Sequence, residues 1–156
     1  MGNEDYYELK VLKWTFRVPK NLVYNENDCW AKIEGDKARV GITDFLQSMA
    51  TDIVFVEFKD VGTEINQFDE VASFESTKTV LDLISPVSGV IVEVNEKLSE
   101  RPELVNQDPY GEGWFTVLQS KDFKSDRENL IDAEKYFEVL KRKVKAEKEK
   151  IGKEVI

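Results

Sequence analysis

The stretch FESTKTVLDLISPVSG, residues 74–89, has the pattern of a β-hairpin with a single lysine at its tip. Apolar residues precede the small polar pair Ser76 and Thr77, and a second apolar run begins at Val80. Two runs rich in Val, Leu, Ile and Phe on either side of a short polar segment indicate two strands joined by a turn. We therefore expect Lys78 to project from the turn of a hairpin.

Segments of the same character occur along most of the chain. They are rich in Val, Ile, Phe and Trp, and they are separated by turn sequences such as EGDK, DVGTE and NQDPYGEG. Short strands at this spacing are typical of an all-β sandwich or barrel. The strands that we predict are 30–33, 38–43, 53–58, 71–74, 80–84, 90–94 and 114–118.

Two segments are predicted to be helical. The sequence DFLQSMA, residues 44–50, follows Thr43, a residue that can cap a helix N-terminus. From residue 125 to residue 151, apolar residues recur at helical spacing, and Ser125 or Asp126 is the candidate cap.

The C-terminal helix changes character along its length, because the residues beyond Leu140 are almost all charged. We expect its first half to pack on the sandwich and its second half to project into solvent, with docking to a partner as the alternative. The predicted organisation is an N-terminal extension over 1–21, a β domain over 22–124 and this helix with its charged tail over 125–156.

The composition excludes several classes of function. The 156 residues are the size of one domain, and a net charge of −9 disfavours contact with nucleic acid phosphates. The chain has no histidine and one cysteine, which removes the commonest general base, histidine metal ligands and a thiolate zinc site. There is no signal-peptide pattern and no apolar run of membrane-spanning length, so we expect a cytoplasmic protein without a membrane partner.

The lysine itself suggests a chemistry that needs no catalytic side chain. A primary amine on a flexible stem is a natural attachment point for a carboxylate cofactor. An amide at Lys78 would remove the charge and create a long arm at the end of a rigid hairpin. The sequence thus favours a carrier over a self-sufficient enzyme.

Several motifs in order along the chain resemble the H proteins of the glycine cleavage system. They are VGITDFLQ, DIVFVE, ESTK, ISPVSGVIVEVNEKL, PELVNQDPYGEGWF and ENLIDAEKYFEVL. The resemblance runs from about Leu22 to about Leu140. It implies a mainly β fold, a flattened barrel-like β-sandwich of the lipoyl/biotinyl hybrid-motif type, with a short internal helix and a C-terminal α-helix.

The resemblance also implies a function. Lipoate would be attached through an amide to Lys78, and Glu75 and Gly89 would mark the hairpin for a lipoate-attaching enzyme. The arm would carry an aminomethyl group between glycine decarboxylase, an aminomethyltransferase and dihydrolipoamide dehydrogenase. Between visits the loaded arm would fold into a cleft away from water.

The chain departs from the family pattern where that cleft is expected. The resemblance places Asn27, Cys29, Met49 and Asp82 at the cleft, and of these Asp82 matches a family aspartate. H proteins usually have His-Glu-Trp where this chain has Asp-Cys-Trp at residues 28–30, and a polar residue where it has Met49.

These departures leave the cargo open. An aminomethyl amine is cationic, and a buried charge without a partner is costly, so replacing the family's glutamate by Cys29 weakens the cleft for that load. One alternative is an H-like lipoate-binding protein that carries sulfur for a heterodisulfide-reductase-like complex. The other is sequence drift in a working H protein. A biotin carrier is disfavoured, because Thr77 and Thr79, and not methionines, flank Lys78.

Overall fold

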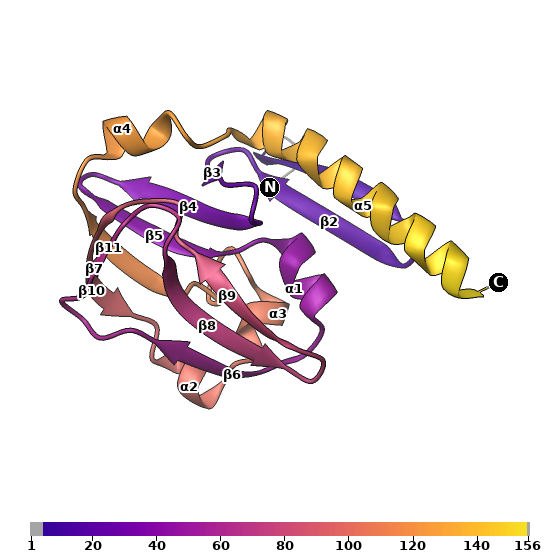
Figure 1. Ribbon diagram of the computed structural model, residues 1–156, viewed down its shortest axis with the longest axis horizontal. Helices are drawn as coiled ribbons and strands as arrows, with labels where there is room; N and C mark the ends of the chain where they lie inside the picture. The colour runs from indigo at the N-terminus through magenta and orange to yellow at the C-terminus, as the bar shows by residue number, and fades with distance from the viewer. Residues whose placement is uncertain (1–4, 156) are drawn as a thin grey trace.

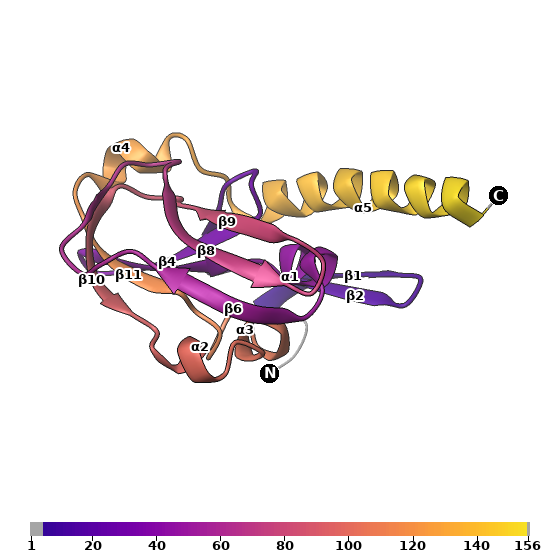
Figure 2. The ribbon, with the colours of Figure 1, turned by 60° about the horizontal axis from the view of Figure 1, so that its bottom comes forward.

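The computed structural model of the chain describes residues 5–155, with side chains described up to residue 150. Two antiparallel sheets face each other as a flattened sandwich, and a hairpin and a long helix extend together beyond one side of it (Figures 1 and 2). Within this part of the chain, no helix is both long and apolar enough to cross a membrane.

The larger sheet has six strands in the order β3-β4-β5-β11-β10-β7, and the smaller sheet has three in the order β6-β8-β9. The strands of the larger sheet are β3 Val23–Tyr24, β4 Cys29–Glu34, β5 Lys37–Ile42, β7 Glu64–Ile65, β10 Gly89–Val94 and β11 Thr116–Ser120. Those of the smaller sheet are β6 Ile53–Phe58, β8 Glu70–Ser76 and β9 Val80–Ile84. A separate two-stranded sheet is formed by β1 Tyr6–Val11 and β2 Trp14–Pro19.

The first hydrophobic core lies between the two sheets. Phe115, which directly precedes β11, packs edge-on against Phe74 of β8 at a centroid distance of 5.8 Å and against Phe58 of β6 at 6.4 Å. Val40, on β5, is fully buried in the same cluster. Burying this apolar area is the main force that closes the sandwich.

A second core lies between the β1–β2 hairpin, helix α1 (Asp44–Ala50) and helix α5 (Ala133–Val155). Phe16 of β2 is fully buried there and packs edge-on against Phe45 of α1 at 5.5 Å. On the other side, Tyr136 of α5 stacks on Tyr24 at 4.6 Å. Within the predicted N-terminal extension, residues 6–19 thus form a hairpin with buried side chains that is part of the fold.

Most predicted elements of the sandwich are present. Each of the seven predicted strands has a counterpart, and the bounds of β6, β9 and α1 agree with the prediction. As predicted, Thr43 caps α1, accepting a hydrogen bond from the Leu46 amide at 3.3 Å. The prediction missed β1, β2, β3 and β7, and it also missed two short helices, α2 (Lys97–Glu100) and α3 (Leu104–Gln107).

The prediction of one continuous helix from residue 125 is wrong. Two helices, α4 (Phe123–Arg127) and α5, are separated by a short extended segment. In that segment Ile131 exchanges backbone hydrogen bonds of 2.9 Å in both directions with Tyr24, which is incompatible with helix. The cap of α5 is accordingly Asp132, whose carboxylate accepts from the Lys135 amide at 2.9 Å. The helix then packs beyond Leu140, since Val144 is also buried.

Candidate functional site

Lys78 lies in the tight turn that joins β8 to β9, and its side chain is exposed. The turn is held by Ser76, which is only 6% exposed. Its hydroxyl oxygen accepts from the Lys78 amide at 3.1 Å and from the Thr79 amide at 3.0 Å. The Ser76 amide also donates to the Thr79 carbonyl at 2.8 Å. The backbone of the lysine is therefore fixed while its side chain stays accessible.

The turn is also attached to the end of α1. The Thr77 amide donates to the Asp52 carbonyl at 3.1 Å, and the hydroxyls of Thr77 and Thr51 lie 3.2 Å apart. Thr51 ends α1 in a left-handed conformation, φ 70°, with its amide bonded to the Gln47 carbonyl. These contacts fix the position of the lysine turn relative to the helix.

A cavity of about 210 Å³ lies beside Lys78. Four elements meet around it, namely the turn of the β1–β2 hairpin, the end of α1, the lysine turn and the far part of α5. Its lining residues are Lys13, Trp14, Ser48, Met49, Thr51, Lys78, Glu147 and Lys150. Of the predicted cleft residues, Met49 is the one that lines this cavity together with Lys78.

Glu75 and Asp82 lie on the outer face of the smaller sheet. Glu75 of β8 is opposite Val80 of β9, Asp82 is opposite Ser73, and the side chains of Glu75, Val80 and Asp82 are exposed. Because side chains alternate between the two faces of a strand, all four residues share one face. Both carboxylates are thus available to a protein that approaches the lysine turn.

Gly89 lies at the opposite end of β9 from Lys78, beyond a five-residue strand that spans roughly 16 Å. It is buried at the start of β10, and a Cβ atom there would lie 2.2 Å from the Gln119 carbonyl oxygen. The close approach of β11 is a structural reason for a glycine at this position, independent of any recognition by an enzyme.

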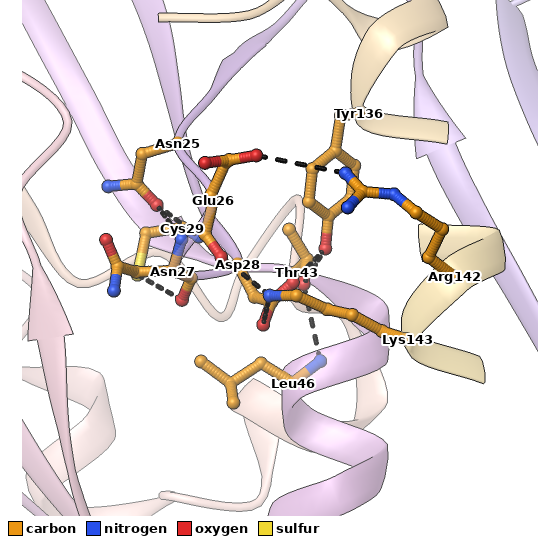
Figure 3. A network of polar contacts seen from close by, with 10 residues as sticks. All are labelled: Asn25, Glu26, Asn27, Asp28, Cys29, Thr43, Leu46, Tyr136, Arg142 and Lys143. Carbon is orange, nitrogen blue, oxygen red and sulfur yellow. Dashed lines mark hydrogen bonds and ion pairs between the residues drawn. The ribbon is translucent and has the colours of Figure 1, made fainter. Parts of the chain in front are cut away.

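Asn27 and Cys29 belong to a polar network in the turn before β4 (Figure 3). The side-chain oxygen of Asn25 accepts from the amides of Asn27 at 3.0 Å and Cys29 at 3.1 Å. The Cys29 thiol donates to the Asn27 carbonyl at 3.5 Å and is fully buried. Neither residue lines the cavity beside Lys78. Burial raises the pKa of the Cys29 thiol to about 12, so the thiol is protonated and unreactive near neutral pH.

The same turn holds α5 through Asp28 (Figure 3). The Asp28 carboxylate accepts a 2.6 Å hydrogen bond from the Tyr136 hydroxyl and a 2.7 Å bond from the Lys143 ammonium group. Lys143 also donates to the Glu26 carbonyl at 2.6 Å. Burial, and next the negative charge of Asp28, raise the pKa of the Tyr136 hydroxyl well above its usual value, so it remains a donor.

Sequence reasoning missed Ser76, Asp28, Lys143 and Trp14 as residues that shape this region. A small hydroxyl residue before the lysine is a usable signal for a side chain that organises a turn. The Asp28–Lys143 pair joins positions that are 115 residues apart in the sequence. In a chain with 34% charged residues, no sequence pattern selects that pair.

Replacing Ser76 by alanine is expected to lower the free energy of unfolding by about 1–2 kcal/mol, because two backbone amides lose their acceptor. Acylation of Lys78 should also become slower, since the turn would no longer be held in one conformation. Thermal unfolding and the rate of enzymatic acylation, followed by intact mass, measure the two effects. Ser73→Ala is the control, because the Ser73 hydroxyl has no hydrogen-bond partner among the contacts found in residues 5–155. Equal behaviour of the two variants would contradict the assignment.

The buried thiol predicts a pH dependence of stability. In the unfolded chain Cys29 loses its proton near its ordinary pKa of 9.0, whereas in the folded chain it keeps the proton up to about pH 12. Its contribution is therefore complete below pH 9 and is lost as the pH rises from 9 to 12, at a slope of at most about 1.4 kcal/mol per pH unit. Denaturant unfolding between pH 8 and 10 should show a shallower decline in Cys29→Ala than in the parent chain. Parallel curves would rule out this linkage.

The comparisons with known proteins agree with one another. The profile of the family "Glycine cleavage H-protein" matches residues 22–143. The glycine cleavage system H protein of Geobacillus thermodenitrificans is 52% identical over 118 residues, which cover 76% of this chain and 92% of that protein. The Thermus thermophilus H protein is 49% identical over 123 residues, covering 79% of this chain and 95% of that protein.

A solved structure has the same fold. The crystal structure of a glycine cleavage system H protein from Mycobacterium marinum superposes with a TM-score of 0.67 at 35% sequence identity, covering 76% of this chain and 95% of that one. With this structure and the profile match over most of the chain, the family is established. This chain belongs to the glycine cleavage H-protein family.

Proposed function

We propose that this chain is a lipoyl carrier of the glycine cleavage system, with lipoate joined through an amide to Lys78. The observation that carries the proposal is an exposed lysine on a turn whose backbone is held by Ser76 and Thr77. Family membership supports the same function. The carrier is not itself catalytic in this proposal, and its task is to present and protect the arm.

The residues around Lys78 fit a lipoyl group. The cavity offers the indole of Trp14 and the thioether of Met49 to an alkyl chain and a dithiolane ring, and polar groups at its rim to the amide. When attached, the dithiolane supplies the redox and group-transfer chemistry, as cofactors generally do. The chain contributes the rigid turn, the accessible amine and a surface against which the arm can lie.

The outer face of the smaller sheet supports recognition by other proteins. Glu75 and Val80 are exposed beside the lysine turn, and Phe55, in register with Glu75 on the neighbouring strand, is 52% exposed. An exposed apolar surface with a carboxylate at its edge is suited to a transient protein contact. We assign this face to the lipoate-attaching enzyme. The glycine decarboxylase, the aminomethyltransferase and the dihydrolipoamide dehydrogenase are the proposed partners of the finished carrier.

Aminomethyl is the proposed cargo, in preference to sulfur. The sulfur alternative depended in part on Cys29, and this thiol is fully buried and outside the cavity beside Lys78. A carboxylate for the cationic amine is available from another element, because Glu147 of α5 lines that cavity. Lys13 and Lys150 line the same cavity, so the site supplies a carboxylate for the amine without a net negative charge, and family membership is what favours the aminomethyl load.

The test is the intact mass of the protein after enzymatic lipoylation and then after incubation with glycine and a pyridoxal-phosphate glycine decarboxylase. We expect a lipoyl increment on Lys78 in the first step and an aminomethyl increment in the second. Omitting glycine is the control for the second step. A protein that is never lipoylated would contradict the carrier assignment, and a lipoylated protein that is never loaded would contradict the cargo.

A further inference from the structure

Much of the cavity beside Lys78 is built by segments that lie outside the family match over residues 22–143. Lys13 and Trp14 come from the turn of the β1–β2 hairpin, and Glu147 and Lys150 come from the far part of α5. These additions sit beside the one lysine that the proposed function requires. An arm attached to Lys78 would therefore lie next to residues from outside the family match.

The two added segments are fixed to the body of the protein and to each other. Tyr7 of β1 stacks on Phe137 of α5 at a centroid distance of 5.3 Å. The Arg17 amide of β2 donates to the Asp44 carboxylate of α1 at 3.0 Å. On α5, Val144 is 3% exposed. The hairpin and helix α5 thus form a packed wall as far as Val144, and Glu147 and Lys150 continue the same helix along the cavity.

The surface of the cavity beside Lys78 is mixed in chemistry. The indole of Trp14 stacks on Phe16 at 6.1 Å and has the Lys13 ammonium over its ring at 5.8 Å. Trp14 and Met49 are the apolar residues that line the cavity, and they are suitable contacts for a saturated chain that ends in a sulfur ring. Lys13 and Lys150 lie at the same cavity with one carboxylate, that of Glu147. With Lys78 unmodified, three cations therefore surround one anion.

Acylation of Lys78 changes this balance. Forming the amide converts the ammonium group into a neutral one, so the like charge of Lys78 no longer opposes Lys13 and Lys150. The same reaction places an apolar chain beside Trp14 and Met49. Both changes favour a closed arrangement of hairpin, helix and arm in the modified protein.

We propose that the turn of the β1–β2 hairpin and the far part of α5 form a docking site for the acylated arm of Lys78, and that acylation itself favours docking. This inference rests on the proposed function, since the ligand is the lipoyl group attached to this lysine. The added segments shield the sulfur atoms of the arm between visits to partner enzymes. Trp14 is the principal contact and Glu147 is the carboxylate available to a cationic load.

The first test measures how fast a maleimide alkylates the reduced arm of the lipoylated protein, followed by intact mass. Cys29 does not interfere, because it is buried and protonated. We expect Trp14→Ala to be alkylated about tenfold faster than the parent protein, equivalent to about 1.4 kcal/mol of docking free energy. Leu12→Ala is the matched control, since Leu12 is 66% exposed on the same hairpin turn and does not line the cavity. Equal rates in all three proteins would overturn the proposal.

The second test needs no lipoate. Lys78→Gln removes the same charge as acylation, and hydrogen exchange of residues 13–16 and 147–150 should slow by about threefold at low salt, a factor typical of exposed charge interactions. The difference should shrink at high salt, because exposed charges are screened. Unchanged exchange would remove the electrostatic part of the inference. Failure of Lys78 to be lipoylated at all, visible by mass before any alkylation, would instead contradict the proposed function and the docking site with it.

Discussion

Lys78→Arg is expected to abolish attachment of lipoate completely while leaving the fold unchanged. The guanidinium group stays protonated and offers no amine that can be acylated, although its charge and length are similar to those of lysine. The side chain at this position is exposed and the turn is held by backbone and Ser76 contacts, so stability should change by less than about 0.5 kcal/mol. Intact mass after enzymatic lipoylation measures the first effect, and thermal unfolding measures the second.

The matched control for this variant is Lys59→Arg, an exposed lysine just beyond β6 on the same sheet. It should be lipoylated to the same extent as the parent chain. A lipoyl increment that persists in Lys78→Arg would place the attachment site at another lysine. A variant that has lost both lipoylation and its thermal transition would show a folding defect, and Lys78→Gln then separates the two causes.

Lys143→Met is expected to lower the free energy of unfolding by about 3 kcal/mol, the largest loss of stability predicted for this chain. The Asp28 carboxylate, whose side chain is 9% exposed, would lose its only ionic partner in the described part of the chain and keep its hydrogen bond from Tyr136. Removing Asp28 and keeping Lys143 should cost less stability. Lys143 is 32% exposed, so its ammonium group can turn toward water. Denaturant unfolding provides the measurement.

Two further variants make this prediction specific. Asp28→Asn with Lys143→Met leaves no buried charge without a partner, so the double variant should recover a large part of the loss, with a coupling of about 1–3 kcal/mol. Asparagine tolerates the left-handed backbone of position 28, φ 64°, so the exchange adds little strain. Lys141→Met removes an exposed ion pair from the same helix and should cost less than about 1 kcal/mol. Equal losses for Lys143→Met and Lys141→Met would refute the role of Asp28.

The sandwich was predictable because its strands carry strong local signals. The strands at 53–58 and 80–84 are short, apolar and bounded by turn residues, and their predicted bounds agree with the structure. The position of Lys78 in a hairpin turn was predictable for a similar reason, since a lone lysine between two apolar runs stands out. The two-residue strands β3 and β7 have no periodicity to detect, because their extended conformation is imposed by their neighbours in the sheet.

The N-terminal hairpin and the C-terminal helix show what local reasoning cannot reach. The alternating pattern of β2, with Phe16 and Val18 buried, is visible only once a second surface is known to cover it. The helix break at Ile131 depends on a backbone pairing with Tyr24, more than a hundred residues earlier in the chain. Whether the four predicted cleft residues lie together also depends on long-range packing, and of the four, Met49 lines the cavity beside Lys78.

The stacking of Tyr7 on Phe137 has a consequence for the order of events during synthesis. The strands that carry Lys78 lie within residues 53–84, so this sheet can form from contacts between neighbouring segments while the chain is still being made. The second core can form only at the end of synthesis, because the β1–β2 hairpin is translated first and helix α5 last. An attaching enzyme that acts on the growing chain would therefore bind the lysine turn before the β1–β2 hairpin and helix α5 have packed beside it. An enzyme that acts after release would meet the completed protein.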